Sequence, residues 1–89
     1  MNQNAVPRLH SHFRLQWEPA QDCHVLLYPE GMVKLNGSAG AILSEVNGAS
    51  SVTDIIASLE AQFPGVESIA DDVMTFLETA RAQRWVEID

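Results

Sequence analysis

The fold is decided by the stretch Leu26-Leu27-Tyr28-Pro29-Glu30-Gly31-Met32-Val33-Lys34-Leu35-Asn36-Gly37-Ser38-Ala39. It has the pattern of a strand, a tight turn, a second strand and the first turn of a helix. Pro29 presets φ for the first central position of a turn, and Gly31 can adopt the left-handed conformation that closes it. The stretch therefore predicts a β-hairpin that leads directly into a helix.

The second strand of this hairpin alternates between apolar and polar side chains. Val33 and Leu35 are expected to face the core, whereas Met32, Lys34 and Asn36 are expected to face outward. A strand at the edge of a sheet has unpaired backbone groups, and an outward row with a Met and a Lys suits the docking of another chain. The pattern favours binding over catalysis.

Two earlier segments predict the other strands of the same sheet. Residues 13–17 alternate apolar and polar side chains, and residues 22–28 are apolar enough for a more buried strand. With residues 32–35 as the hairpin partner, the short connections predict a three-stranded antiparallel meander. Residues 1–12 are polar and without periodicity, so we expect a flexible N-terminal tail and one domain over residues 13–89.

After residue 36 the apolar period changes from about 2 to about 3.6, which predicts three helices and an α+β fold. Asn36 or Ser38 can cap the first helix, which is expected to end at residues 47–48. Ser51 and Asp54 have the spacing of a capping box, in which the hydroxyl and the carboxylate meet amides of the first turn of the second helix.

The third helix is expected to start after Ser68 with the same capping pattern and to run to about residue 84. Residues 85–88 are either its frayed end or a short strand. Two apolar lines follow this helix, one through Val73 and Leu77 and one through Met74 and Leu77. A helix packed on one neighbour needs a stripe about 100° wide. The wider stripe indicates either deeper burial or the wall of a groove, and Met suits a groove because its side chain adapts to varied partners.

Composition excludes several classes of function. The chain of 89 residues carries a net charge of −7, and from Gly37 onward nine carboxylates face only Arg81 and Arg84. Such a chain repels phosphate backbones, which disfavours nucleic acid as a partner. No apolar run approaches the ~20 residues of a membrane span. Cys23 is the only cysteine, which fits a reducing compartment, and we expect a cytoplasmic protein without membrane contact.

Residues that could support catalysis or bind a metal do not form a recognisable set. His10 and His12 lie two apart, and Cys23 and His24 are adjacent, which is not the usual spacing of zinc ligands. We expect no catalytic residue, no metal and no cofactor. Strands followed by three helices also fit a winged helix-turn-helix, but residues 52–62, the second helix, contain no Lys or Arg to contact DNA.

Taken together, these residues resemble the PqqD family of pyrroloquinoline quinone biosynthesis. The resemblance spans nearly the whole chain after residue 13, and Tyr-Pro-Glu-Gly followed by Lys-Leu-Asn is its most specific part. It is carried by Arg14-Leu15-Gln16-Trp17-Glu18, His24-Val25, Leu27-Tyr28-Pro29-Glu30-Gly31-Met32, Lys34-Leu35-Asn36, Ile42-Leu43, Gly48, Ile55-Ile56, Phe63-Pro64, Asp71-Asp72-Val73, Phe76-Leu77 and Trp85.

The resemblance implies a non-catalytic peptide chaperone, a recognition element of pathways that modify ribosomally made peptides. Its implied partners are the precursor peptide PqqA and the radical S-adenosylmethionine enzyme PqqE, and its implied fold is winged helix-turn-helix-like. In the family the peptide adds as a strand to the third strand of the sheet and lies against the third helix. Carried onto this chain, the peptide-binding residues are Met32, Val33, Lys34, Leu35 and Asn36 on the strand, and Val73, Met74, Leu77 and Arg81 on the helix.

Two alternatives stay open at this point. The chain can instead be a degenerate winged-helix domain that binds DNA or has a purely structural interaction role. Its assembly is also open between a monomer and a homodimer, because the short hinges at residues 18–19 and 64–65 permit elements to be swapped between chains.

Overall fold

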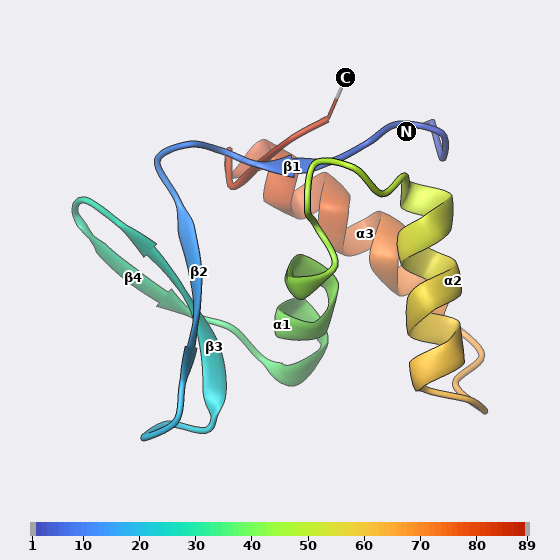
Figure 1. Cartoon of the computed structure of the whole chain (residues 1–89), viewed down its shortest axis with the longest axis horizontal. Coiled ribbons are helices and arrows are strands. Elements are labelled where there is room, and N and C mark those ends of the chain that lie inside the picture. Colours follow the sequence, from blue (N-terminus) through green and yellow to red (C-terminus); the bar gives the residue numbers. More distant parts are fainter. Residues whose placement is uncertain (1, 89) are drawn as a thin grey trace.

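The computed structural model describes residues 2–88, which form five strands and three helices (Figure 1). The elements in chain order are β1 Arg8–Leu9, β2 Arg14–Glu18, β3 Cys23–Tyr28, β4 Gly31–Lys34, α1 Gly37–Ser44, α2 Val52–Gln62, α3 Ile69–Ala82 and β5 Val86–Glu87. Both the α+β class and the order of a three-stranded meander before three helices are as predicted. None of these helices is long and apolar enough to cross a membrane.

The three longer strands form an antiparallel sheet with the order β2-β3-β4, so β3 is central and β4 lies at an edge. Tyr28 pairs with Gly31, which leaves Pro29 and Glu30 as a two-residue turn. Gly31 has a positive φ of 159°, a value that L residues rarely adopt, although it lies outside the left-handed helical region that was expected. Gly31 already belongs to the ladder, and it is Pro29 and Glu30 that reverse the chain.

The core consists of two groups of buried apolar side chains that share α1. In Figure 1, α1 lies between the three-stranded sheet and the pair α2–α3. The helical cluster is formed by Ile42, Val52, Ile55, Ile56, Leu59, Ile69, Val73 and Leu77. The sheet cluster is formed by Leu26, Leu35, Ala39, Leu43, Ala80 and Val86. Because neighbouring residues Ile42 and Leu43 belong to different clusters, α1 fixes the sheet relative to the other helices.

The caps of the first two helices are as the sequence predicts, and that of the third is not. The Asn36 side chain accepts a hydrogen bond from the Ala39 amide at 2.8 Å. Ser51 and Asp54 form a complete capping box, with distances of 3.1 and 3.2 Å. The Ser68 side chain caps no amide, and its backbone (φ −104°, ψ 19°) is not the extended one of Asn36 and Ser51; its hydroxyl donates to the Asp72 carboxylate at 3.1 Å.

Two helices end earlier than predicted. α1 ends at Ser44 rather than at residues 47–48. α3 ends at Ala82, where the amide of Trp85 donates to the carbonyl of Ala80 at 2.9 Å and Arg84 adopts a left-handed φ of 63°. This arrangement turns the chain out of the helix. The following residues form the short strand β5, which was one of the two expected outcomes.

The expectation of a flexible tail over residues 1–12 is not met in its described part, residues 2–12. β1 pairs with β5, and Pro7 is fully buried. The carbonyls of Gln3 and Ala5 accept hydrogen bonds from the amides of Thr53 and Val52 at 3.0 and 2.9 Å. These contacts are made by backbone groups, so the pattern of side chains in the sequence does not predict them. The folded unit therefore includes the segment before residue 13, and residues 1 and 89 lie outside the described part.

Candidate functional site

The free edge of β4 is the first component of the candidate site. The amide of Leu35 donates to the carbonyl of His24 at 3.0 Å, which fixes the alternation of the antiparallel ladder between β3 and β4. Gly31, Val33 and Leu35 thus direct their backbone groups toward β3. The backbone N–H and C=O groups of Met32 and Lys34 point the other way, away from the sheet. An added strand would form its hydrogen bonds with these two residues.

The side chains of the same segment follow the predicted alternation. Met32 is 49% exposed and Lys34 is exposed, whereas Val33 is half-buried against the sheet cluster and Leu35 is 6% exposed. Asn36 is exposed but has a structural task, since its side chain caps α1. Of the five strand residues expected to bind peptide, Met32 and Lys34 present both backbone and side chain outward.

The four residues expected on the helix do not form one accessible wall. Val73 and Leu77 are 1% and 0% exposed and belong to the helical cluster. Met74 is half-buried and packs against the same cluster. Arg81 is exposed and pairs with Glu78 at 3.0 Å. Deeper burial, the other interpretation of the wide apolar stripe, describes Val73 and Leu77, because α1 and α2 both cover this helix.

An apolar groove supplies the accessible surface that these helix residues do not. It has a volume of about 340 Å³ and lies between the start of α1, the end of α2 and the start of α3. Its lining residues are Gly37, Ser38, Ala41, Ile42, Leu59, Phe63, Val66, Ile69, Asp72 and Val73. Gly37 and Ser38 directly follow the β4 segment, so the groove begins close to where the free edge ends.

Sequence reasoning missed most of this groove. The sequence analysis assigns no binding role to Phe63 or to Val66. In the structure both side chains line the groove and are still 46% and 51% exposed. Two large apolar side chains on either side of Pro64 and Gly65 are unusual in an exposed connection, and that was the available signal.

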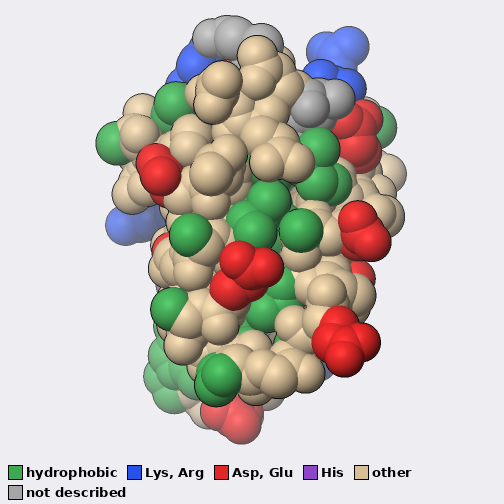
Figure 2. All heavy atoms as spheres, turned by 90° about the vertical axis from the view of Figure 1, so that its right-hand side faces the viewer, with side chains coloured by type: hydrophobic (Ala, Val, Ile, Leu, Met, Phe, Trp, Pro, Cys, Tyr) green, Lys and Arg blue, Asp and Glu red, His purple; other side chains and the backbone are tan. Residues whose placement is uncertain are grey.

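The surface around the helices is apolar and acidic. Figure 2 faces the side of the molecule that carries α2 and shows apolar side chains gathered at its centre and toward its lower edge. Carboxylates lie among and around them, and the lower half of this face shows no Lys or Arg. An apolar surface with this charge suits a partner that brings its own cations.

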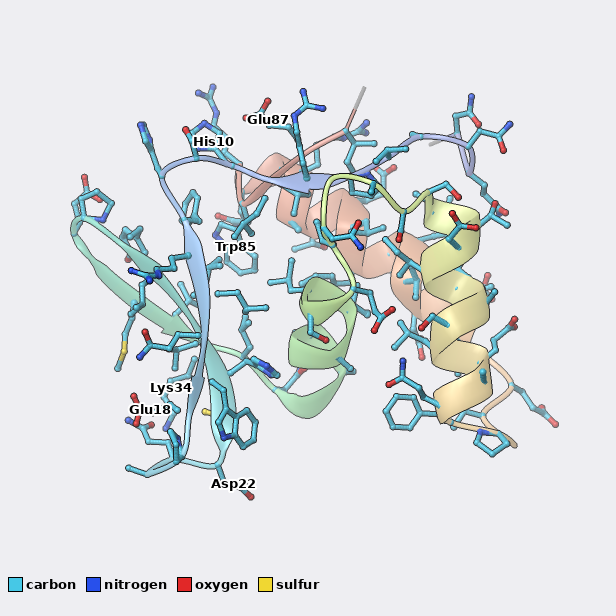
Figure 3. All side chains as sticks on the ribbon, viewed as in Figure 1. His10, Glu18, Asp22, Lys34, Trp85 and Glu87 are labelled. Carbon is cyan, nitrogen blue, oxygen red and sulfur yellow. The ribbon has the colours of Figure 1, made fainter. Side chains whose placement is uncertain are left out.

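His10 and His24 pack against neighbouring aromatic rings. The rings of Trp17 and His24 meet edge-to-face at 5.0 Å, and His24 abuts Gly40 of α1. His10 packs against Phe13 and lies 4.0 Å from a Glu87 carboxylate oxygen. Figure 3 shows His10 and Glu87 at the upper edge of the molecule, Lys34, Glu18 and Asp22 at the lower left, and Trp85 between these two groups. Among residues 2–88, no three His, Cys, Asp or Glu side chains are grouped to hold a metal ion.

A free sheet edge beside an apolar groove, on a small α+β domain, defines a recognition domain for an extended chain. The comparison with known families makes this specific. The family described as "Coenzyme PQQ synthesis protein D (PqqD)" matches residues 23–86. This chain belongs to the PqqD family.

Individual relatives agree with this assignment. The PqqA binding protein of Azotobacter vinelandii is 56% identical over 85 residues, which cover 96% of this chain and 92% of that protein. The PqqA binding protein of Pseudomonas paraeruginosa is 59% identical over the same length and coverage. Both relatives are named for binding rather than for a reaction.

A solution NMR structure is also similar to this one. It is the PqqD truncation of Methylobacterium extorquens PqqCD, described as a functional and stand-alone recognition element for ribosomally synthesized and post-translationally modified peptides. The TM-score is 0.79 at 30% identity, over 98% of this chain and 94% of that one. The predicted family and fold are confirmed by these comparisons, as is a binding rather than an enzymatic role.

Proposed function

We propose that this chain binds the precursor peptide PqqA as an added strand on β4 and presents it to the radical S-adenosylmethionine enzyme PqqE in the cytoplasm. The observation that carries the proposal is the free edge of β4, where the backbone groups of Met32 and Lys34 point away from the sheet. The names of the relatives support PqqA as the peptide. The part played by PqqE rests on the family resemblance.

The edge alone is a weak binding site. Met32 and Lys34 together offer two N–H and two C=O groups, and each hydrogen bond contributes about 1 kcal/mol net. Their sum of roughly 4 kcal/mol would give a Kd of about 1 mM even without the entropic cost of association, which weakens binding further. Burying one large apolar side chain adds about 1.5–3 kcal/mol. The proposal therefore needs the groove beside the edge, where Phe63 and Val66 can cover such a side chain.

A pair of variants at Lys34 tests strand addition. Lys34→Pro removes the outward N–H and places a ring on the edge without removing a hydrogen bond to β3, whereas Lys34→Ala removes only the charged side chain. We expect Lys34→Pro to bind synthetic PqqA at least about tenfold more weakly than Lys34→Ala. Amide NMR spectra would show whether the β3–β4 hairpin is retained. Equal affinities of the two folded variants would refute strand addition at β4.

An amide NMR titration with synthetic PqqA locates the site independently. We expect shifts at Met32 and Lys34 and at the groove residues Phe63 and Val66. Shifts confined to β2, the other edge of the sheet, would move the site there. The role of PqqE is measured separately, as the amount of crosslinked PqqA that PqqE forms with and without this chain, and an unchanged yield would refute presentation.

A further inference from the structure

The helical part of the chain has an extreme distribution of charge. Residues 37–80, which include α1, α2 and all but the end of α3, contain no Lys or Arg. They contain seven carboxylates, namely Glu45, Asp54, Glu60, Glu67, Asp71, Asp72 and Glu78. Every residue that lines the apolar groove belongs to this segment. No lining residue therefore carries a positive charge, and any charged group bound in the groove meets carboxylates first.

Acidic residues lie at the end of the groove formed by α3. Asp72 itself lines the groove, and the hydroxyl of Ser68 donates to its carboxylate at 3.1 Å, which orients it. Glu67 and Asp71 are exposed neighbours of the lining residues Val66 and Asp72 along the chain. The α3 macrodipole moderates these charges but does not reverse their sign.

The charge changes sign between the two components of the site. Lys34 is exposed on β4, and no described carboxylate lies within ion-pair distance of it. A chain that lies along β4 and continues past Gly37 and Ser38 therefore moves from a cation to a rim that carries Asp72.

From this geometry we infer that the groove accepts a segment of the bound peptide in which an apolar side chain is adjacent to a Lys or Arg. The inference rests on the proposed function and adds the chemical class of the segment that the groove selects. The groove volume of about 340 Å³ is at the lower end of ligand sites, which are typically ~300–1,000 Å³. It holds one or two side chains, with Phe63 and Val66 against the apolar part and Asp72 against the charge.

The size of the effect follows from the exposure of the rim. Asp72 is exposed, and ion pairs of this kind are screened by water and salt. Removing one such pair lowers affinity by about 1.5-fold to fivefold. Reversing the charge replaces attraction by repulsion and has a larger effect. Both effects shrink at high salt, because the Debye length falls to about 4 Å at about 0.5 M.

The test compares charge reversal at the groove with the same reversal elsewhere on the helices. Asp72→Lys and Glu60→Lys change the net charge equally, but Glu60 is an exposed residue of α2 that does not line the groove. Affinity for synthetic PqqA would be measured by calorimetry at about 0.05 M and about 0.5 M salt. We expect Asp72→Lys to bind at least about fivefold more weakly than Glu60→Lys at low salt, with the difference largely lost at high salt.

A milder variant protects the test against loss of folding. Asp72→Asn removes the charge with little change of shape and is expected to weaken binding about twofold. The inference is overturned if folded Asp72→Lys binds PqqA at least as tightly as Glu60→Lys, and folded Asp72→Asn at least as tightly as the unchanged chain. The proposed function would still stand in that case. If the unchanged chain does not bind PqqA at all, the proposed function itself fails.

Discussion

The contact between Gly40 and His24 sets how closely α1 approaches the sheet, and Gly40→Ala tests it. A Cβ atom added at Gly40 would lie 2.9 Å from Nδ1 of His24 and 3.2 Å from its Cβ. The His24 ring has little room to withdraw, because Trp17 packs edge-to-face against it at 5.0 Å. Gly37 is the matched control in the same helix, since a Cβ there would meet nothing within 4 Å.

Two opposing terms decide the magnitude. Replacing Gly by Ala within a helix stabilises it by about 0.5–1 kcal/mol. Overpacking a buried site costs about 1–3 kcal/mol. For Gly40→Ala we expect the free energy of unfolding to fall by about 1 kcal/mol, which lowers Tm by about 4–8 °C. For Gly37→Ala, at the first helical residue, we expect a gain of about 0.5 kcal/mol at most.

Urea unfolding followed by circular dichroism measures both variants. A double-mutant cycle with His24→Ala then isolates the contact, because Gly40→Ala should become stabilising once the ring is gone. The expected coupling is about 1.5–2 kcal/mol. A Gly40→Ala variant as stable as Gly37→Ala, or a cycle in which the two changes simply add, would show that His24 does not limit the approach of α1.

Three further predictions concern single residues. Ser51→Ala should lower the free energy of unfolding, measured in urea, by about 1 kcal/mol because it removes the α2 cap. Ser68→Ala should have almost no effect, because the Ser68 side chain caps no amide; equal losses would contradict the assigned caps. Lys34→Glu should weaken binding of PqqA in calorimetry and leave Tm nearly unchanged, and an unaltered affinity would remove its charge from the site. Met74→Asp should lower Tm by 5 °C or more, about 1 kcal/mol or more of stability, because it buries a charge against the helical cluster; a variant that keeps its Tm but loses PqqA binding would instead place Met74 in the peptide site.

The strands β2, β3 and β4 and the three helices could be predicted because each leaves a local trace in the sequence. Alternation along residues 32–35 identified both the strand and its inward side chains, Val33 and Leu35. Asn36 and Ser51 identified helix starts, because their side chains bond to amides only a few residues away. Ser68 does not cap α3, because its backbone lacks the extended conformation of Asn36 and Ser51 that directs the side-chain oxygen toward the first amides.

Long-range contacts and the accessible part of the site left no such trace. The pairing of β1 with β5 joins backbones nearly the whole chain apart, and two residues are too few to show a period. The wide apolar stripe of α3 was correctly noticed, but periodicity does not say which neighbour covers it. In the structure Leu77 of this stripe is fully buried, whereas Val66, which precedes α3, is 51% exposed at the groove.

The pairing of β1 with β5 also governs how this domain can be tethered. It brings the side chains of Arg8 and Glu87 within 3.4 Å, and both ends of the described chain lie on the same side of the molecule (Figure 1). That side carries His10 and Glu87 and lies opposite Lys34 (Figure 3). A linker attached at either end of the described chain would therefore leave from the side of the domain away from Lys34 (Figures 1 and 3). If the domain were linked to another protein in this way, β4 would stay unobstructed. The link would also raise the effective concentration of that protein near the free edge of β4.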